Sequence, residues 1–332
     1  MTPEARWIQP IAGRTIAAQA VERMVHTALP RSRVLEIEQF PEGLRNSNFK
    51  IGLDSPPHRI VLRVYQHDVS LCQKELDLTG LVGGVVAVPE VIHAQPGGLD
   101  ELPPFLLRRY VEGITFMELR RGSDTEAIAQ AAHSAGETLA AIGRFTFPKP
   151  GWLGPGPTSG TPLLEGSDPI PRFMDLCMES PNLHQRVPPD LRDRTHELAW
   201  SHAPQLAALA AESTLVHGDY NKRNVLVREE AGRWSVAAVL DWEFAVAGAA
   251  LADVANFVRY ERAERPRAEP HFSTGYLEAG GKLPTNWRYL AKVLDLTALC
   301  ESLTREDLPD SVTIELVELL RATIERRDPR FS

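Results

Sequence analysis

The chain has 332 residues, of which 24% are charged and 43% hydrophobic, a composition typical of globular proteins. Its formal net charge of −8 argues against nucleic-acid binding, because phosphate backbones attract basic proteins. There is no apolar run of about 18 residues that would predict a membrane span, and the opening segment MTPEARWIQP lacks the pattern of a signal peptide. Three widely spaced cysteines, Cys72, Cys177 and Cys300, favour buried free thiols in a reducing compartment, so we expect a cytoplasmic protein.

The acidic excess lies in the second part of the chain. Residues 1–112 carry 12 basic and 13 acidic side chains, whereas residues 113–332 carry 24 and 31. Two interpretations remain open: a solubilising surface, which we favour, and a cleft that attracts a cationic ligand.

Apolar periodicity predicts a strand-rich N-terminal part followed by a mostly helical part. In the first part we expect helices over 14–29 and 68–83, and strands over 34–40, 48–53, 59–65, 90–94 and 105–111. In the second part we expect a β-rich stretch over 214–241, and helices over 124–143, 171–180, 190–211, 250–262, 267–279, 285–304 and 311–326. Residues 148–171, in which 12 of 24 positions are Pro or Gly, predict a long loop.

Polar side chains follow two apolar strands of the β-rich stretch. The segment His217-Gly-Asp219-Tyr-Asn-Lys-Arg-Asn224 lies between apolar runs, and Asp241 ends the strand predicted over 235–240. Phosphoryl transfer needs a carboxylate beside the attacking hydroxyl and oxygen ligands that hold Mg²⁺ on the phosphates. The pattern therefore predicts that Asp219, Asn224 and Asp241 converge at a phosphoryl-transfer site.

The motif resembles that of the aminoglycoside phosphotransferase and choline kinase-like family, which has a protein-kinase-like fold. The residues that carry the resemblance are His217, Gly218, Asp219, Asn224, Val225, Leu226, Leu240, Asp241, Trp242, Glu243, Gly248 and Asp253. The resemblance implies an α+β bilobal fold with a small β-rich N-lobe and a larger, mostly helical C-lobe. The implied divisions are a nucleotide-binding lobe over 1–107, a hinge over 108–113, and a lobe over 114–332 with the catalytic loop and acceptor site.

The resemblance also implies roles for residues of the C-lobe. Asp219 is expected to act as the catalytic base, and Asn224 and Asp241 as Mg²⁺ ligands. Supporting roles are implied for His217, Glu243 and Asp253. Lys222 and Arg223 are candidate γ-phosphate contacts, although we favour exposed charges at both positions.

In the N-lobe, the resemblance implies a site for ATP, and the sequence leaves GTP open. Arg63 matches the phosphate-binding lysine of kinases, and Glu75 is placed to pair with it. Ser47 lies in the segment that matches the phosphate-covering loop, where backbone amides also meet phosphates. The carbonyl of Arg109 and the amide of Val111 are expected to bind the base.

The acceptor site is implied to lie among the helices after the catalytic loop. Candidate lining carboxylates are Glu261, Glu264, Asp295 and Glu301; the alternative for each is a solvated helix face. The acidic bias of this lobe favours a cationic acceptor, whereas the arginines over 259–267 argue against an acidic funnel.

We therefore expect an ATP-dependent kinase that phosphorylates a hydroxyl of an aminoglycoside-like antibiotic, with a role in antibiotic resistance, or of a small metabolite. One alternative is a catalytically silent nucleotide-binding module, which only the arginine at position 63 favours. A metal-dependent hydrolase is a poorer alternative, because no second cluster of metal ligands is evident. We expect a monomer or homodimer without nucleic-acid or membrane partners.

Overall fold

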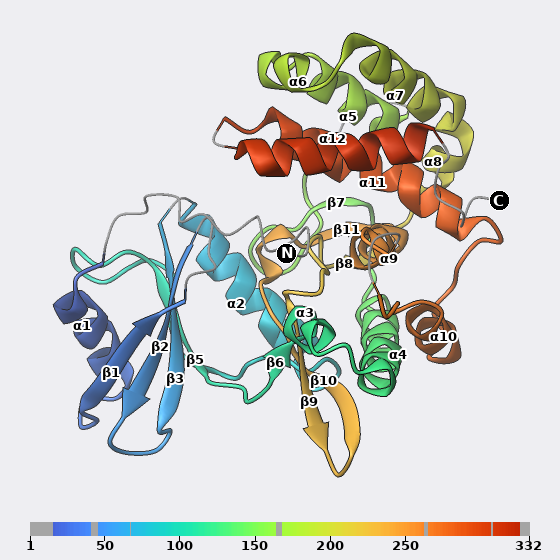
Figure 1. Ribbon diagram of the computed structural model, residues 1–332. Coiled ribbons are helices and arrows are strands. Elements are labelled where there is room, and N and C mark those ends of the chain that lie inside the picture. Colours follow the sequence, from blue (N-terminus) through green and yellow to red (C-terminus); the bar gives the residue numbers. More distant parts are fainter. Residues whose placement is uncertain are drawn as a thin grey trace.

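The computed structural model describes residues 16–40, 46–66, 68–163, 168–261, 265–306 and 308–325. A twisted sheet with two helices forms the N-terminal part, and a larger, mostly helical part lies beside it (Figure 1). The expected α+β architecture with a β-rich and a helical lobe is confirmed. None of the described helices is both long and apolar enough to cross a membrane.

The N-terminal lobe is built on an antiparallel sheet of five strands in the order β1-β2-β3-β5-β4. Its strands are β1 (Val34–Gln39), β2 (Asn46–Leu53), β3 (Arg59–Tyr65), β4 (Val91–Gln95) and β5 (Phe105–Arg109), with helices α1 (Ala18–Ala28) and α2 (Ser70–Val82). The register pairs Arg63 with Leu106 and Val61 with Arg108. Because side chains alternate along a strand, Arg63 and Arg108 lie on the same face of the sheet.

The C-terminal lobe consists of helices around two small three-stranded sheets, ordered β10-β9-β6 and β7-β11-β8. The helices are α3 (Phe116–Arg121), α4 (Thr125–Ile142), α5 (Pro169–Met178), α6 (Pro181–Arg186), α7 (Pro189–Ser201), α8 (Ala203–Ala210), α9 (Leu251–Val258), α10 (His271–Glu278), α11 (Trp287–Thr304) and α12 (Asp310–Ile324). The strands are β6 (Ile114–Thr115), β7 (Gly151–Trp152), β8 (Thr214–Val216), β9 (Val225–Glu230), β10 (Arg233–Val239) and β11 (Val246–Gly248). The loop from β8 to β9 carries the predicted catalytic residues, and the end of β10 carries Asp241.

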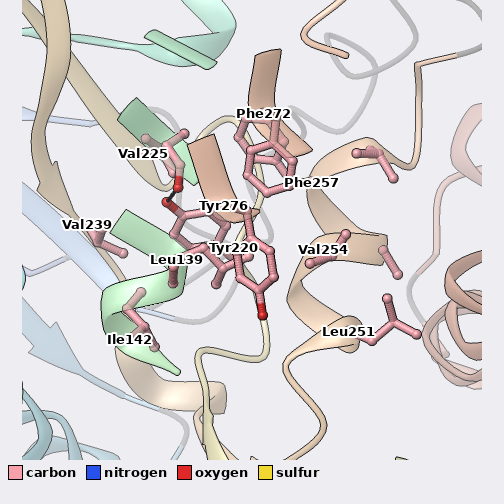
Figure 2. Packing of buried hydrophobic residues seen from close by; sticks show 14 of the residues in the cluster. Leu139, Ile142, Tyr220, Val225, Val239, Leu251, Val254, Phe257, Phe272 and Tyr276 are labelled. Atoms are coloured by element: carbon pink, nitrogen blue, oxygen red, sulfur yellow. Dashed lines mark hydrogen bonds between the residues drawn. The ribbon is translucent and has the colours of Figure 1, made fainter. Parts of the chain in front are cut away.

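A large apolar cluster lies behind these loops. Tyr220, from the β8–β9 loop, gathers with Phe257 of α9 and with Phe272 and Tyr276 of α10 (Figure 2). Helix α10 sits very close to α4. A Cβ added to Gly275 of α10 would lie only 2.1 Å from the carbonyl oxygen of His133 on α4. Glycine at this crossing lets the two backbones touch, and it fixes α10 on α4.

The structure differs from the sequence-based expectation at several boundaries. The single helix predicted over 190–211 is two helices, α7 and α8, since Pro204 lacks an N–H and fits only in the first turn of α8. The loop predicted over 148–171 includes β7 and ends where Pro169 begins α5. The short helices α3 and α6 were missed, because six residues are too few to show a period.

Candidate active site

Asp219 lies in the loop between β8 and β9 and is surrounded by asparagine amides. Asn221 Nδ2 donates to its Oδ1 at 2.7 Å, and Asn224 Nδ2 donates to its Oδ2 at 2.7 Å. A third amide, Asn256 Nδ2 of α9, lies 3.5 Å from Oδ1. Burial, together with the negative charge of Asp241, raises the pKa of Asp219 to about 6. The carboxylate is thus oriented and poised to take a proton near neutral pH.

The backbone of this loop is held by Asp253 at the start of α9, as the resemblance implied. Its carboxylate accepts the N–H of His217 at 2.6 Å and the N–H of Gly218 at 2.9 Å. His217 Nε2 lies 2.8 Å from the Leu240 carbonyl, and its Nδ1 accepts the N–H of Asp219. Burial lowers the pKa of His217 to about 4, so the ring is neutral and joins the loop to the end of β10.

Asn224 and Asp241 are brought together by the backbone of the strand ends. The N–H of Leu240 donates to the carbonyl of Asn224 at 2.8 Å, which places Asp241 directly beside this loop. Asp241 has a positive φ of 66°, a local conformation that turns the chain sharply after β10. The predicted convergence of Asp219, Asn224 and Asp241 is therefore present in the tertiary structure.

Arg63 reaches Asp241 from the opposite lobe and is engaged by three carboxylates. Its Nη2 lies 2.5 Å from Oδ1 of Asp241 and 2.9 Å from Oε2 of Glu243, and its Nε lies 3.0 Å from Oε2 of Glu75. The predicted pairing of Arg63 with Glu75 is confirmed. Asn46, at the start of β2, also donates to Glu243 at 2.5 Å, so Glu243 joins the two lobes.

Arg108 and Tyr65 complete this network, and both were missed from sequence. Arg108 Nη1 donates to Oε1 of Glu75 at 2.9 Å, and the Tyr65 hydroxyl donates to Oε2. Burial alone would raise the pKa of Glu75, but Arg108 and Arg63 lower it to about 2. Period-two alternation puts residues 106 and 108 on one face of β5, but only the pairing of β5 with β3 places that face beside Arg63.

The donor set fits a Mg²⁺ ion bound together with phosphates. Asn224 makes both of its hydrogen bonds to Asp219 through Nδ2, which leaves its amide oxygen for a cation. The described part of the chain has no group of three or more His, Cys, Asp or Glu side chains placed for a metal ion. Magnesium in phosphoryl transfer typically takes one or two protein ligands plus phosphate oxygens and water, so Asn224 and Asp241 would suffice.

Of the other predicted nucleotide contacts, Ser47 was expected in a loop, but it is the second residue of β2 and pairs with Val64 of β3. Its hydroxyl donates to Gln66 Oε1 at 2.8 Å. Arg109 ends β5, where its side chain pairs with Glu90; base binding by its carbonyl stays a prediction. Val111 follows in the segment that joins β5 to β6.

A cavity of about 540 Å³ lies elsewhere, along the C-terminal half of α2 and the connection from α2 to β4. None of the predicted site residues lines it. The cavity is largely apolar, whereas Asp219, Asn224 and Asp241 supply two carboxylates and an amide. The candidate site is therefore assigned to these three residues.

The expectation of an exposed charge at Lys222 is wrong. The Lys222 side chain is 1% exposed, and its Nζ lies 3.2 Å from Oε1 of Glu261, which is fully buried. Glu261 also accepts backbone N–H groups of Ala268 and Glu269, so it is engaged in the protein and is not free to line an acceptor pocket. No sequence pattern indicates this pair, because the loop is polar and aperiodic.

The remaining acceptor candidates do not form one acidic surface. Asp295 is buried and bound by Arg259, with Nη2 to Oδ1 at 2.7 Å and Nε to Oδ2 at 3.0 Å. Glu301 pairs with Arg305 one helical turn away. Glu264 lies outside the described residues. An acidic funnel for a polycation is therefore not built from these described side chains.

Comparisons with known proteins identify the family and the fold of the chain. A family model described as the phosphotransferase enzyme family matches residues 36–292. The crystal structure of aminoglycoside phosphotransferase APH(4)-Ia is 20% identical, with a TM-score of 0.66 over 93% of this chain and 99% of that chain. A ternary complex of a thermostable mutant of that enzyme with AMP-PNP and hygromycin B is 19% identical, with a TM-score of 0.67 over 93% and 99% of the two chains.

A further similar structure is the GDP and kanamycin complex of APH(2")-IIIa. It is 15% identical, with a TM-score of 0.67 over 92% of this chain and 98% of that chain. At these identities the likeness establishes the kinase-like fold. No curated protein matches the chain at the sequence level.

Proposed function

The chain belongs to the phosphotransferase enzyme family, and we propose that it transfers the γ-phosphate of a nucleoside triphosphate to a hydroxyl of a small molecule. The observation that carries the proposal is the convergence of Asp219, Asn224 and Asp241, with Arg63 reaching Asp241 from the other lobe. Such a set supplies positioning and electrostatic stabilisation, which account for most catalysis in phosphoryl transfer.

In this proposal each side chain has one task. Asp219 accepts the proton of the attacking hydroxyl, and the amides of Asn221 and Asn224 keep its carboxylate oriented. Asn224 and Asp241 would hold Mg²⁺, which supplies neutralising charge to the phosphate oxygens. Arg63 exchanges Asp241 for phosphate oxygens when the nucleotide binds, and Glu75 keeps its guanidinium in place.

ATP is the proposed donor, and GTP is the alternative. Similar structures contain AMP-PNP in one case and GDP in another. The proposed acceptor is an aminoglycoside-like antibiotic or a small metabolite with a hydroxyl group. Hygromycin B and kanamycin, which occur in those complexes, are the first acceptors to test, beside hydroxyl metabolites such as choline and homoserine.

The decisive experiment combines nucleotide binding with transfer. We expect AMP-PNP to bind only when Mg²⁺ is present, as measured by calorimetry, and ATP turnover to rise with the correct acceptor. Asp219→Asn should bind AMP-PNP like the wild type and lose roughly 10³-fold or more in turnover. Asp100→Asn, an exposed change in the N-lobe, is the control and should keep full turnover.

Two outcomes would contradict the proposal. Wild-type turnover in Asp219→Asn would remove Asp219 from the reaction. Tight AMP-PNP binding without transfer to any acceptor in a broad hydroxyl panel would favour the catalytically silent module, to which the arginine at position 63 also points.

A further inference from the structure

Lys222 is a buried cation inside the loop that carries the proposed catalytic residues. It lies three residues after Asp219 and two before Asn224. Its ammonium group pairs with Glu261 beyond the end of α9, and both side chains are almost fully removed from solvent. The partners are 39 residues apart in sequence, so the pair joins the loop to a distant segment of the C-lobe.

Glu261 in turn is fixed to the segment that leads into α10. Its Oε1 accepts the N–H of Ala268 at 3.3 Å, and its Oε2 accepts the N–H of Glu269 at 3.1 Å. Glu261 therefore holds the Lys222 ammonium group in a defined position relative to the backbone just before α10. A side-chain contact alone would leave more freedom, because the carboxylate itself would rotate.

The start of α10 is a rigid anchor. Phe272 stacks on Phe257 at 4.1 Å between ring centroids (Figure 2). Lys222 Nζ lies 5.3 Å from the centroid of the Phe257 ring. The close crossing of α10 with α4 at Gly275 prevents sliding of α10. Tyr220, next to Asp219, is tied to the same unit, since its hydroxyl donates to the Ala135 carbonyl of α4 at 2.8 Å.

Fold stability does not explain why this position carries a buried ion pair. Removing two charges from water is unfavourable, and apolar residues of similar volume often give equal stability. An ion pair with additional hydrogen bonds does, however, define a direction and a distance that an apolar contact does not. Lys222 lies between Asp219 and Asn224 in the chain, which indicates that the pair fixes this part of the loop.

We propose that Lys222 and Glu261 are positioning residues that hold the loop from Asp219 to Asn224 against α10, and so set the separation of the proposed base and metal ligand. Neither residue touches the reacting groups. The inference rests on the proposed phosphotransfer for its catalytic consequence, while the mechanical coupling of loop and helix is testable without it.

The variants are chosen to separate positioning from stability. Lys222→Met removes the cation and leaves the buried Glu261 carboxylate without its lysine partner, so it is expected to lower stability. The double variant Lys222→Met with Glu261→Gln removes both charges of this pair, and the glutamine keeps one acceptor oxygen for one of the two backbone N–H groups. Glu278→Gln is the control, because it breaks the exposed pair of α10 with His133 on α4 without touching the loop.

We expect the double variant to melt above Lys222→Met, because no buried carboxylate has lost its lysine, and to lose roughly 10- to 100-fold in kcat, as small displacements of catalytic groups do. Its KM for the nucleotide should stay within about threefold of the wild-type value, because neither substitution removes a proposed contact to the nucleotide. Glu278→Gln should keep the wild-type kcat. A double variant that regains both stability and kcat would overturn the proposal, since the pair would then serve folding alone.

Hydrogen exchange followed by mass spectrometry gives a readout that does not depend on activity. Amide exchange in the peptide over 217–225 should be roughly tenfold faster in the double variant and unchanged in Glu278→Gln. Unchanged exchange in the double variant would refute the coupling. If the wild type neither binds AMP-PNP nor transfers phosphate, the proposed function fails, and the exchange data still decide whether Lys222 ties the loop to α10.

Discussion

Replacing Glu75 with glutamine removes the negative charge that two buried arginines share. The carboxylate is fully buried and lies within 3.0 Å of Arg63 and within 2.9 Å of Arg108. Tyr65 donates to the same group. Glutamine has nearly the same volume, so the change tests charge and hydrogen bonding without creating a cavity.

The magnitude follows from the carboxylate pKa, which the two arginines lower from its usual 4.5 to about 2. This difference corresponds to about 3 kcal/mol of stability above pH 4.5. Loss of one partner from a buried ion pair typically costs about 3–5 kcal/mol, which agrees. Because the folded-state pKa is lowered, this stability is present above the unfolded pKa and is lost as the pH falls toward 2.

Urea unfolding at several pH values is the assay. Glu75→Gln should be less stable than the wild type by about 3 kcal/mol at neutral pH, and the difference should shrink in acid as the wild-type carboxyl is protonated. Asp100→Asn, which breaks an exposed 3.6 Å pair with Arg23, should show no measurable change. Equal stability of Glu75→Gln and the wild type at neutral pH would refute the electrostatic reasoning.

Three further predictions follow from the same structure. Burial raises the pKa of Asp219 to about 6, so kcat/KM in a pH titration should fall about tenfold per unit below that value; a flat profile would exclude ionised Asp219 as the base. Arg63→Lys replaces a guanidinium group that contacts three carboxylates with a single ammonium group. Calorimetry should then show about tenfold weaker binding of the Mg²⁺-nucleotide, and an unchanged Kd would contradict phosphate binding by Arg63. Gly275→Ala should lower the unfolding free energy by at least about 1–3 kcal/mol, because its Cβ would lie 2.1 Å from the His133 carbonyl, whereas Gly80→Ala has open space and should stabilise α2.

The local pattern of the sequence was enough to predict a strand-rich part followed by a helical part and the residues of the catalytic loop, whereas the two-lobed architecture was implied by the family resemblance. Short apolar runs that end in polar groups predict strands and the loops after them, and the spacing from His217 to Asn224 is a local property of one loop. The pairing of Arg63 with Glu75 was implied by the family resemblance, and the structure has it. Helix boundaries were less certain where a proline, such as Pro204, ends one helix and begins the next.

Only the tertiary structure decided which charges neutralise one another. Arg108 and Lys222 carry no sign of their partners in their own segments, since Glu75 and Glu261 lie 33 and 39 residues away. The acceptor carboxylates were chosen from the helices that the family resemblance implies, yet Glu261 and Asp295 are bound by Lys222 and Arg259 inside the fold. The physical reason is that apolar periodicity reports which face of an element is buried, whereas an ion pair forms between whichever side chains packing brings within a few ångströms, at any separation along the chain.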